Sequence, residues 1–191
     1  MKTSFIGLAL AVLAGTAVAA PVTYKIDPGH TFPSFEADHM GGMSIWRGKF
    51  RSSSGQIVLD MTAHSGSVDI AVDANSIDFG HDKLNEHAKS AQMFDVAKFP
   101  TATYKGKLTD FSGASPAAVE GELTLHGVTK PVHLTINSFK CMMNPMMKKE
   151  VCGADASASF NRADFGIDYG KDFGFNMMVK LAIQVEAVKA E

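Results

Sequence analysis

Apolar and polar side chains alternate with a period of two along most of this chain. The clearest example is residues 121–136, where two short alternating runs meet around a turn at residues 127–131. One face of these runs carries Leu123, Leu125, Val132, Leu134 and Ile136, and the other carries Glu122, Thr124, His126, His133 and Thr135. Successive side chains of a strand point to opposite faces, so this stretch predicts a β-hairpin whose dry face covers an apolar interior.

The same alternation recurs from one end of the chain to the other. It is found in residues 22–26, 35–39, 57–61, 68–72, 102–108, 154–160 and 173–187. The last of these segments is the longest. So many half-buried strands, with so little helix between them, predict an all-β fold.

One segment breaks this period. Leu84 and His87 have the spacing of a helix face, and Asp82 is a candidate N-cap. The sequence therefore predicts one short helix near residues 82–93. It is expected either to plug one end of the core or to line a ligand site.

The N-terminus predicts export. Lys2 precedes an apolar run at residues 5–18, and the small residues that end in Ala19 form a cleavage pattern, as in a secretory signal peptide. Cleavage after Ala19 leaves residues 20–191 as one periplasmic domain. No later segment approaches the roughly 20 apolar residues that a membrane span requires, so no integral span is expected.

Charge and length narrow the class of protein. Removing Lys2 from the 18 basic side chains leaves 17 against 20 acidic ones. The mature chain therefore has a small negative net charge and lacks the excess of basic residues that binds nucleic acid. Subtracting 19 residues from 191 leaves 172, enough for one well-filled core. This length fits a single β-barrel or sandwich better than two domains.

The only two cysteines, Cys141 and Cys152, are predicted to form a disulfide in an oxidising compartment. In the chain-entropy model, closing so short a loop contributes roughly 3 kcal/mol to stability. The enclosed loop carries Met142, Met143, Met146 and Met147. Thioethers and thiolates are soft ligands that suit Cu(I), so copper binding is the alternative to a loop whose methionines cover apolar surface.

Catalytic motifs are absent from the sequence. It contains neither the G-x-S-x-G nucleophile elbow nor the H-E-x-x-H metal motif, and Asp164 near Arg162 indicates a turn ion pair. His126 and His133 share a face of the predicted hairpin, but two exposed histidines make a weak metal site. We therefore expect no enzyme activity, no catalytic residues, no metal and no cofactor.

Several short motifs follow one another in order over nearly the whole mature chain. They are Y-K-I-D-P-G-H at residues 24–30, F-E-A-D-H-M-G at 35–41, G-K-F at 48–50, Gly55, S-I-D at 76–78, M-F-D at 93–95, F-P at 99–100, G-E-L-T-L-H-G-V-T-K-P at 121–131, C-G-A-D at 152–155 and R-A-D-F-G at 162–166. This set resembles the YceI-like polyisoprenoid-binding family. The resemblance implies an extended, antiparallel, lipocalin-like β-barrel that is exported in Gram-negative bacteria and holds a long isoprenoid or a similar amphiphile. It also implies a possible homodimer.

An eight-stranded barrel either just fills with side chains or holds one small ligand. Abundant Phe and Met would supply smooth, adaptable apolar surface for a flexible chain. The candidate ligand-binding residues are Phe32, Phe35, His39, Met40, Phe50, Leu84, His87, Met93 and Phe94. His39 is the best polar candidate, because the alternation places it on the face of Phe35, although a hydrogen-bonded core histidine is the commoner outcome.

The sequence thus predicts a periplasmic carrier that holds an isoprenoid-like amphiphile, such as a polyprenyl lipid or a quinone, in an apolar barrel of about eight strands. The alternative is a periplasmic copper-binding protein that uses the methionine-rich segment between the cysteines. A third interpretation is an envelope interaction module whose interior is filled by side chains.

Overall fold

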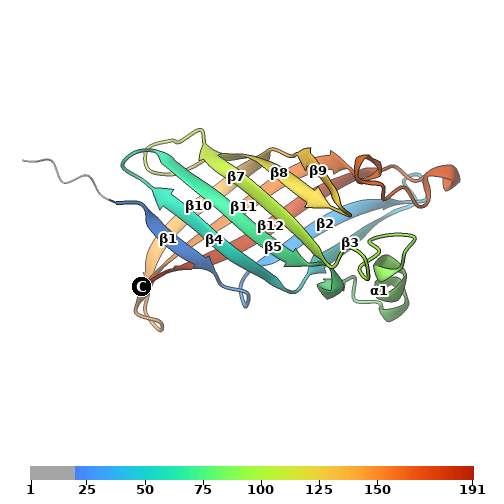
Figure 1. Cartoon of the computed structure of the whole chain (residues 1–191), viewed down its shortest axis with the longest axis horizontal. Coiled ribbons are helices and arrows are strands. Elements are labelled where there is room, and N and C mark those ends of the chain that lie inside the picture. Colours follow the sequence, from blue (N-terminus) through green and yellow to red (C-terminus); the bar gives the residue numbers. More distant parts are fainter. Residues whose placement is uncertain (1–19) are drawn as a thin grey trace, which may run out of the picture.

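Antiparallel pairing joins twelve strands into one sheet that closes on itself (Figure 1). The computed structural model describes residues 20–191, so the predicted signal peptide and its cleavage site after Ala19 fall outside or at the edge of the described residues. The strands are β1 (Val22–Ile26), β2 (Phe32–His39), β3 (Ser44–Phe50), β4 (Ser53–Asp60), β5 (Ser65–Asp73), β6 (Ile77–Asp78), β7 (Thr101–Thr109), β8 (Ala118–Leu125), β9 (Val128–Pro131), β10 (Leu134–Asn144), β11 (Lys149–Asn161) and β12 (Met178–Lys189).

Eight of these strands form a closed ring in the order β1-β4-β5-β7-β8-β10-β11-β12. The ring closes where Ile26 of β1 lies opposite Ala187 of β12. The predicted all-β barrel of about eight strands is therefore confirmed. β12 is longer than β1, and the unused part of its edge pairs with β2, which in turn pairs with β3. The barrel wall is thus extended at one end.

The hairpin that the sequence predicts is present, but its turn was misplaced. His126 and Gly127 have φ angles of 52° and 76° and form a two-residue turn between β8 and β9. Positive φ at both central residues suits the twist of a tight hairpin. The segment Val128–Pro131, predicted as turn, is instead a strand that pairs with β8.

The methionine-rich segment is a strand hairpin, where the sequence predicted a loop. β10 and β11 remain paired up to Asn144 and Lys149, so Cys141 lies directly opposite Cys152 at a Cα separation of 4.0 Å. The two cysteines form the predicted disulfide. The four methionines between them are exposed by 46–87%. They therefore cover little of the apolar core.

Removing the disulfide by the double substitution Cys141→Ala and Cys152→Ala should lower the free energy of unfolding by roughly 3 kcal/mol, because the unfolded chain loses a crosslink. Urea unfolding of the oxidised protein and of the double variant measures the difference. The double variant should have the same free energy of unfolding as the wild-type protein reduced with dithiothreitol. Adding dithiothreitol to the variant should not change its stability. Equal stability of the oxidised protein and the variant would contradict a structural role for this bond.

Within residues 20–191, a single α-helix, α1 (Asp82–Lys89), interrupts the strands. Its N-cap is His81 and not Asp82, because the His81 ring accepts a hydrogen bond from the backbone N–H of Leu84. The helix ends earlier than the predicted residue 93. Ser90 takes an extended backbone conformation, and its N–H bonds back to the carbonyl of His87.

The predicted strand at residues 173–187 begins only at Met178. The chain before it forms two 3-10 turns, η2 (Arg162–Phe165) and η3 (Lys171–Phe173). Gly170 and Gly174 flank η3 with φ angles of 88° and 80°, which interrupts extended backbone. We call residues 166–177 the mouth loop. Among residues 20–191, no helix has the length and apolar character of a membrane span.

Candidate functional site

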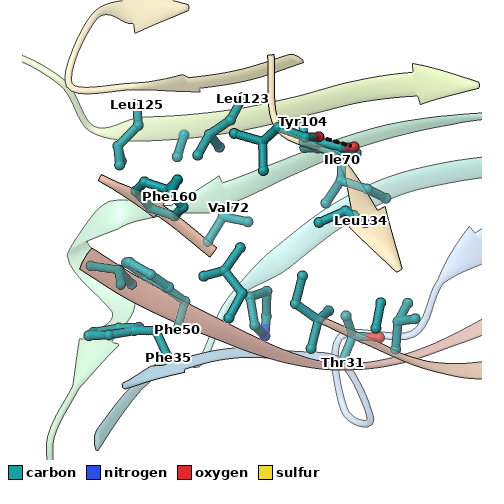
Figure 2. A pocket seen from close by; sticks show the side chains of 18 of the residues that line it. Thr31, Phe35, Phe50, Ile70, Val72, Tyr104, Leu123, Leu125, Leu134 and Phe160 are labelled. Atoms are coloured by element: carbon teal, nitrogen blue, oxygen red, sulfur yellow. Dashed lines mark hydrogen bonds between the residues drawn. The ribbon is translucent and has the colours of Figure 1, made fainter. Parts of the chain in front are cut away.

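An apolar cavity of about 520 Å³ occupies the barrel interior. All eight ring strands contribute side chains to its wall, and β2 and β3 add theirs at one end. Figure 2 shows Phe35, Val72 and Leu123, from three different strands, around this common space. Its volume lies within the range of roughly 300–1,000 Å³ that is usual for ligand sites.

The cavity is long and narrow. Alternate residues of β12 line it from Val179 to Ala187, which are eight residue steps apart along one strand. At ~3.3 Å per residue, this distance is about 26 Å along the strand, somewhat less along the tilted barrel axis. Such a shape suits an extended chain better than a compact ring system.

One end of the cavity is closed by buried side chains. Tyr24, Leu59 and Ala187 are only 1–3% exposed there. The Tyr24 hydroxyl donates a hydrogen bond of 2.5 Å to Oε1 of Glu150. Burial and this carboxylate raise the pKa of Tyr24 well above its usual range, so the phenol remains a neutral donor. The polar atom at the closed end is therefore already satisfied.

The hydroxyl of Tyr104, in the middle of the wall, is already hydrogen-bonded within the protein. Tyr104 points into the barrel, and its hydroxyl donates to the carbonyl of Val132 at 2.7 Å (Figure 2). Burial raises the pKa of Tyr104 to about 12. The phenol joins β7 to the short segment between β9 and β10 and leaves the tunnel apolar at neutral pH.

The opposite end is the mouth, where wall residues become exposed. Tyr169 is 39% exposed, and His39, Trp46 and Phe175 are partly buried. The ring of His39 packs edge-on against Phe175 and Trp46, with centroids 5.2 and 6.0 Å away. Aromatic side chains therefore frame the opening.

Helix α1 carries a polar group to the mouth. The ring of His87 forms part of the cavity wall and packs 4.7 Å from the ring of Tyr169. Its Nε2 atom is buried and lacks a hydrogen-bond partner among residues 20–191. Buried polar atoms without partners are rare in folded proteins and often mark a functional site.

Arg162 places a buried positive charge in the wall near the mouth. Its side chain is not in the turn ion pair with Asp164 that the sequence predicts, because Nη1 donates to the carbonyl of Ile167 and Nη2 to that of Tyr169, both at 2.8 Å. No carboxylate of residues 20–191 forms an ion pair with this guanidinium. Burial lowers the pKa of Arg162, yet arginine stays charged at neutral pH.

Asp38 ties the two sides of the mouth together. Its carboxylate accepts hydrogen bonds from the backbone N–H groups of Asn176 at 2.9 Å, Gly42 at 2.7 Å and Gly41 at 2.9 Å. These bonds join the β2–β3 turn to the mouth loop. The bond from Asn176, followed by those from the glycines, lowers the pKa of Asp38 below its usual range.

Acidification should loosen the mouth, because protonation of Asp38 weakens these three bonds. The folded-state pKa lies below the unfolded value of about 3.9, so the stabilisation is present above that pH and is lost as the pH falls through the folded-state pKa. Hydrogen exchange should show protection factors at Gly41, Gly42 and Asn176 that hold from pH 6 to about pH 4 and fall as the pH is lowered further. Asp38→Asn should lower them already at pH 6, and unchanged protection in that variant would contradict this role.

A model of the YceI-like domain matches residues 24–187. The chain belongs to the YceI-like family. Curated relatives called Protein YceI, from Salmonella arizonae and Salmonella paratyphi B, are each 34% identical over 196 residues, with 99% of both chains covered.

Solved structures share this YceI-like barrel. BcnA from Burkholderia cenocepacia superposes with a TM-score of 0.66 at 22% identity, covering 85% of this chain and 99% of that one. A polyisoprenoid binding domain from Saccharophagus degradans superposes at 0.60 with 16% identity, covering 88% and 99%. The Campylobacter jejuni YCEI protein superposes at 0.63 with 18% identity, covering 98% and 94%. At these identities, the likeness shows the fold.

In this YceI-like barrel, seven of the nine predicted ligand-binding residues line the cavity. They are Phe35, His39, Phe50, Leu84, His87, Met93 and Phe94. Phe32 and Met40 do not line it. Phe32 is three residues from the inward Phe35, an odd number that turns it to the outer face, where Lys49 lies 5.0 Å from its ring centroid. Met40 follows the end of β2 in the turn and is 50% exposed.

Sequence reasoning missed four mouth residues of the YceI-like site, namely Trp46, Arg162, Tyr169 and Phe175. Trp46 lies opposite the inward Ala37 in β3, a strand that the sequence did not predict because Ile45 and several polar residues blur its alternation. The four aromatic side chains among residues 162–175 were the available signal. This signal did not indicate their direction.

One group of residues in the described part of the YceI-like chain has the spacing of a metal site. It consists of Cys141, Glu150 and Cys152. The two sulfurs are joined in the disulfide and are not available as thiolates in this oxidised form. The two hairpin histidines that the sequence placed on one face have different partners. His126 contacts the carbonyl of Phe165, whereas His133 contacts Glu120.

Proposed function

We propose that this protein is a periplasmic carrier for a long-chain, isoprenoid-like amphiphile, such as a polyprenyl lipid or a quinone. The observation that carries the proposal is the long apolar cavity, closed at the Tyr24 end and polar only near its mouth. In this arrangement the ligand's chain lies in the tunnel, and its head group lies among His39, His87 and Arg162. The role is binding and transport, without catalysis.

Burial of the chain accounts for the affinity. About twenty chain carbons at ~0.8 kcal/mol each contribute roughly 16 kcal/mol before the costs of association, which approaches the practical ceiling for noncovalent binding. The polar residues at the mouth then select the head group. A cavity wall of Leu, Val, Ile and Phe side chains also favours a flexible hydrocarbon chain as the ligand, rather than a solute that needs hydrogen bonds.

The comparisons and the chemistry of the chain add support. The Saccharophagus degradans neighbour is described as a polyisoprenoid binding domain. The disulfide is typical of an oxidising compartment, and the predicted signal peptide leads to the periplasm. An open interior also supports a ligand carrier over an interaction module filled by side chains.

Protein purified from the periplasm of its own bacterium tests the proposal. Native mass spectrometry should show a mass above that of residues 20–191, and organic extraction should release one lipid class with a long isoprenoid chain. Protein expressed in the cytoplasm without residues 1–19 and refolded serves as the unloaded control. Periplasmic protein that carries no lipid, and that does not take up a polyprenyl lipid or a quinone in detergent solution, would refute the proposal.

The head-group role of His87 predicts a selective loss. His87→Phe keeps an aromatic ring and removes the unpaired Nε2, so we expect about tenfold weaker binding of an oxygen-bearing amphiphile and unchanged binding of a pure hydrocarbon. The Tyr169 ring packs on His87 and must move for a head group to reach Nε2. Fluorescence titration with both ligands measures the ratio.

Glu86→Gln, on the exposed side of the same helix, is the matched control for that titration and should leave both affinities unchanged. Equal weakening of both ligands by His87→Phe would assign His87 to packing and remove it from the head-group site.

A further inference from the structure

Exposed apolar side chains gather at the two ends of the barrel. Ten large apolar residues are exposed in the part of the chain that the structure describes. Four of them, Met142, Met143, Met146 and Met147, lie on the β10–β11 hairpin beside the C-terminus at the closed end (Figure 1). The other six, Met40, Met43, Ile45, Tyr169, Phe173 and Met178, lie at the mouth end. The barrel waist between them exposes none.

Contacts join the segments at the mouth into one rim. The carboxylate of Asp38 bonds both the β2–β3 turn and Asn176 of the mouth loop. Ile45 lies directly opposite Asp38 across the β2–β3 pair, and the neighbouring Val179 pairs with β2. We define the mouth rim as Met40, Met43, Ile45, Phe173 and Met178, which are exposed by 44–73%.

The mouth rim surrounds the opening of the cavity on its outer side. Ile45 and Met178 directly precede the wall residues Trp46 and Val179 in their strands, so their side chains face outward. Phe173 stands two residues before Phe175, which lines the wall, and is exposed itself. Exposed apolar side chains therefore lie next to wall residues at the end where the cavity opens.

The surroundings of the rim match the boundary of a bilayer. Trp46, the only tryptophan of the chain, and Tyr169 frame the opening, and these two residue types favour the level of lipid head groups. Beside Phe173, the adjacent charges of Lys171 and Asp172 are of opposite sign. The rim thus offers apolar side chains and amphipathic rings with little local net charge.

We infer that the mouth rim docks on the surface of a lipid bilayer, so that the ligand passes between membrane and cavity without crossing water. The partner is a bilayer of neutral head groups, since the rim has no excess of basic residues. Single side chains at the ends of turns insert among head groups more readily than they form the flat, complementary surface of a dimer. This inference rests on the proposed function for its purpose, but bilayer binding itself does not require a bound ligand.

Flotation with phosphatidylcholine vesicles that contain no isoprenoid tests the docking. Wild-type residues 20–191 should float with the vesicles, and the double variant Met43→Ser, Phe173→Ser should bind them at least tenfold more weakly. The double variant Met142→Ser, Met146→Ser removes two exposed apolar side chains at the closed end and is the matched control. It should float like the wild-type protein.

Ligand uptake in detergent solution separates this inference from the proposed function. The rim variant should still take up a polyprenyl lipid there, because neither substituted residue lines the cavity. Failure of the wild-type protein to float, or equal loss of flotation in both double variants, would overturn the docking and leave the carrier proposal standing. Flotation of the wild-type protein without any ligand uptake would refute the carrier proposal and leave the docking inference standing.

A second copy of the chain is the competing occupant of the rim. Sedimentation equilibrium of the wild-type protein and the rim variant distinguishes it. The docking inference expects the same mass for both proteins in solution. A wild-type dimer that the rim substitutions dissociate, together with no flotation of the wild-type protein, would assign the rim to a homodimer interface.

Discussion

Replacing Ala156 with tryptophan should weaken binding of a long-chain ligand about 100-fold and leave the barrel folded. Ala156 is buried in β11, its side chain lines the cavity, and its strand neighbour Ile183 lines the same wall. An indole ring at this point occupies space that about four methylenes of the ligand would fill, so roughly 3 kcal/mol of apolar burial is lost. Because the space is open in the unliganded barrel, the larger side chain does not overpack the core.

The neighbouring strand offers a control of the same chemistry. Ala182 of β12 lies between the wall residues Leu181 and Ile183, and its side chain is exposed on the outer face. Ala182→Trp should leave the affinity unchanged. Isothermal titration in detergent solution and thermal melting measure affinity and folding for both variants. Unaltered affinity in a folded Ala156→Trp protein would show that the ligand does not occupy the tunnel.

Replacing Arg162 with leucine should lower the free energy of unfolding by about 4 kcal/mol. The substitution removes both guanidinium donors and leaves the carbonyls of Ile167 and Tyr169 without them. Each buried group left unsatisfied costs roughly 1–3 kcal/mol. The mouth loop should loosen first, since these two bonds hold its beginning against the end of β11.

Urea unfolding of Arg162→Leu measures this loss, with Arg47→Leu as the control. Arg47 is an exposed arginine whose side chain pairs with Glu36, and surface pairs of this kind contribute about 1 kcal/mol or less. The stability of Arg162→Lys should lie between those of the two leucine variants. An ammonium group keeps the positive charge but lacks the forked guanidinium that reaches both carbonyls. If Arg162→Leu were no less stable than Arg47→Leu, the buried guanidinium would not organise the mouth.

The wall of the cavity was predictable wherever alternation is strong. Leu123, Leu125 and Leu134 line the cavity as their period of two predicts, and so do Phe35 and His39. Phe32 was predicted from its residue type, whereas its odd spacing from Phe35 already pointed to the outer face. Periodicity is therefore the better guide to orientation, because the pleat of a strand is a local property of the backbone.

The mouth was not predictable in the same way. Arg162, Tyr169 and Phe175 belong to turns, where no period relates sequence position to direction. Their positions depend on the guanidinium bonds and on the bond from Asn176 to Asp38, residues that are 138 positions apart in the chain. Such contacts are set by packing at long sequence separation, and a single sequence does not display them.

The sequence by itself determined the all-β class, most of the inward-facing side chains, the cysteine pair and the family. These features follow from local geometry, from residue type or from motifs that are contiguous in the chain. Only the tertiary structure decided that β12 closes the ring against β1, that an open tunnel remains inside, and that His87, Arg162 and the mouth rim meet at one end. Closure and cavity volume depend on how strands distant in sequence pair and tilt, so no local pattern encodes them.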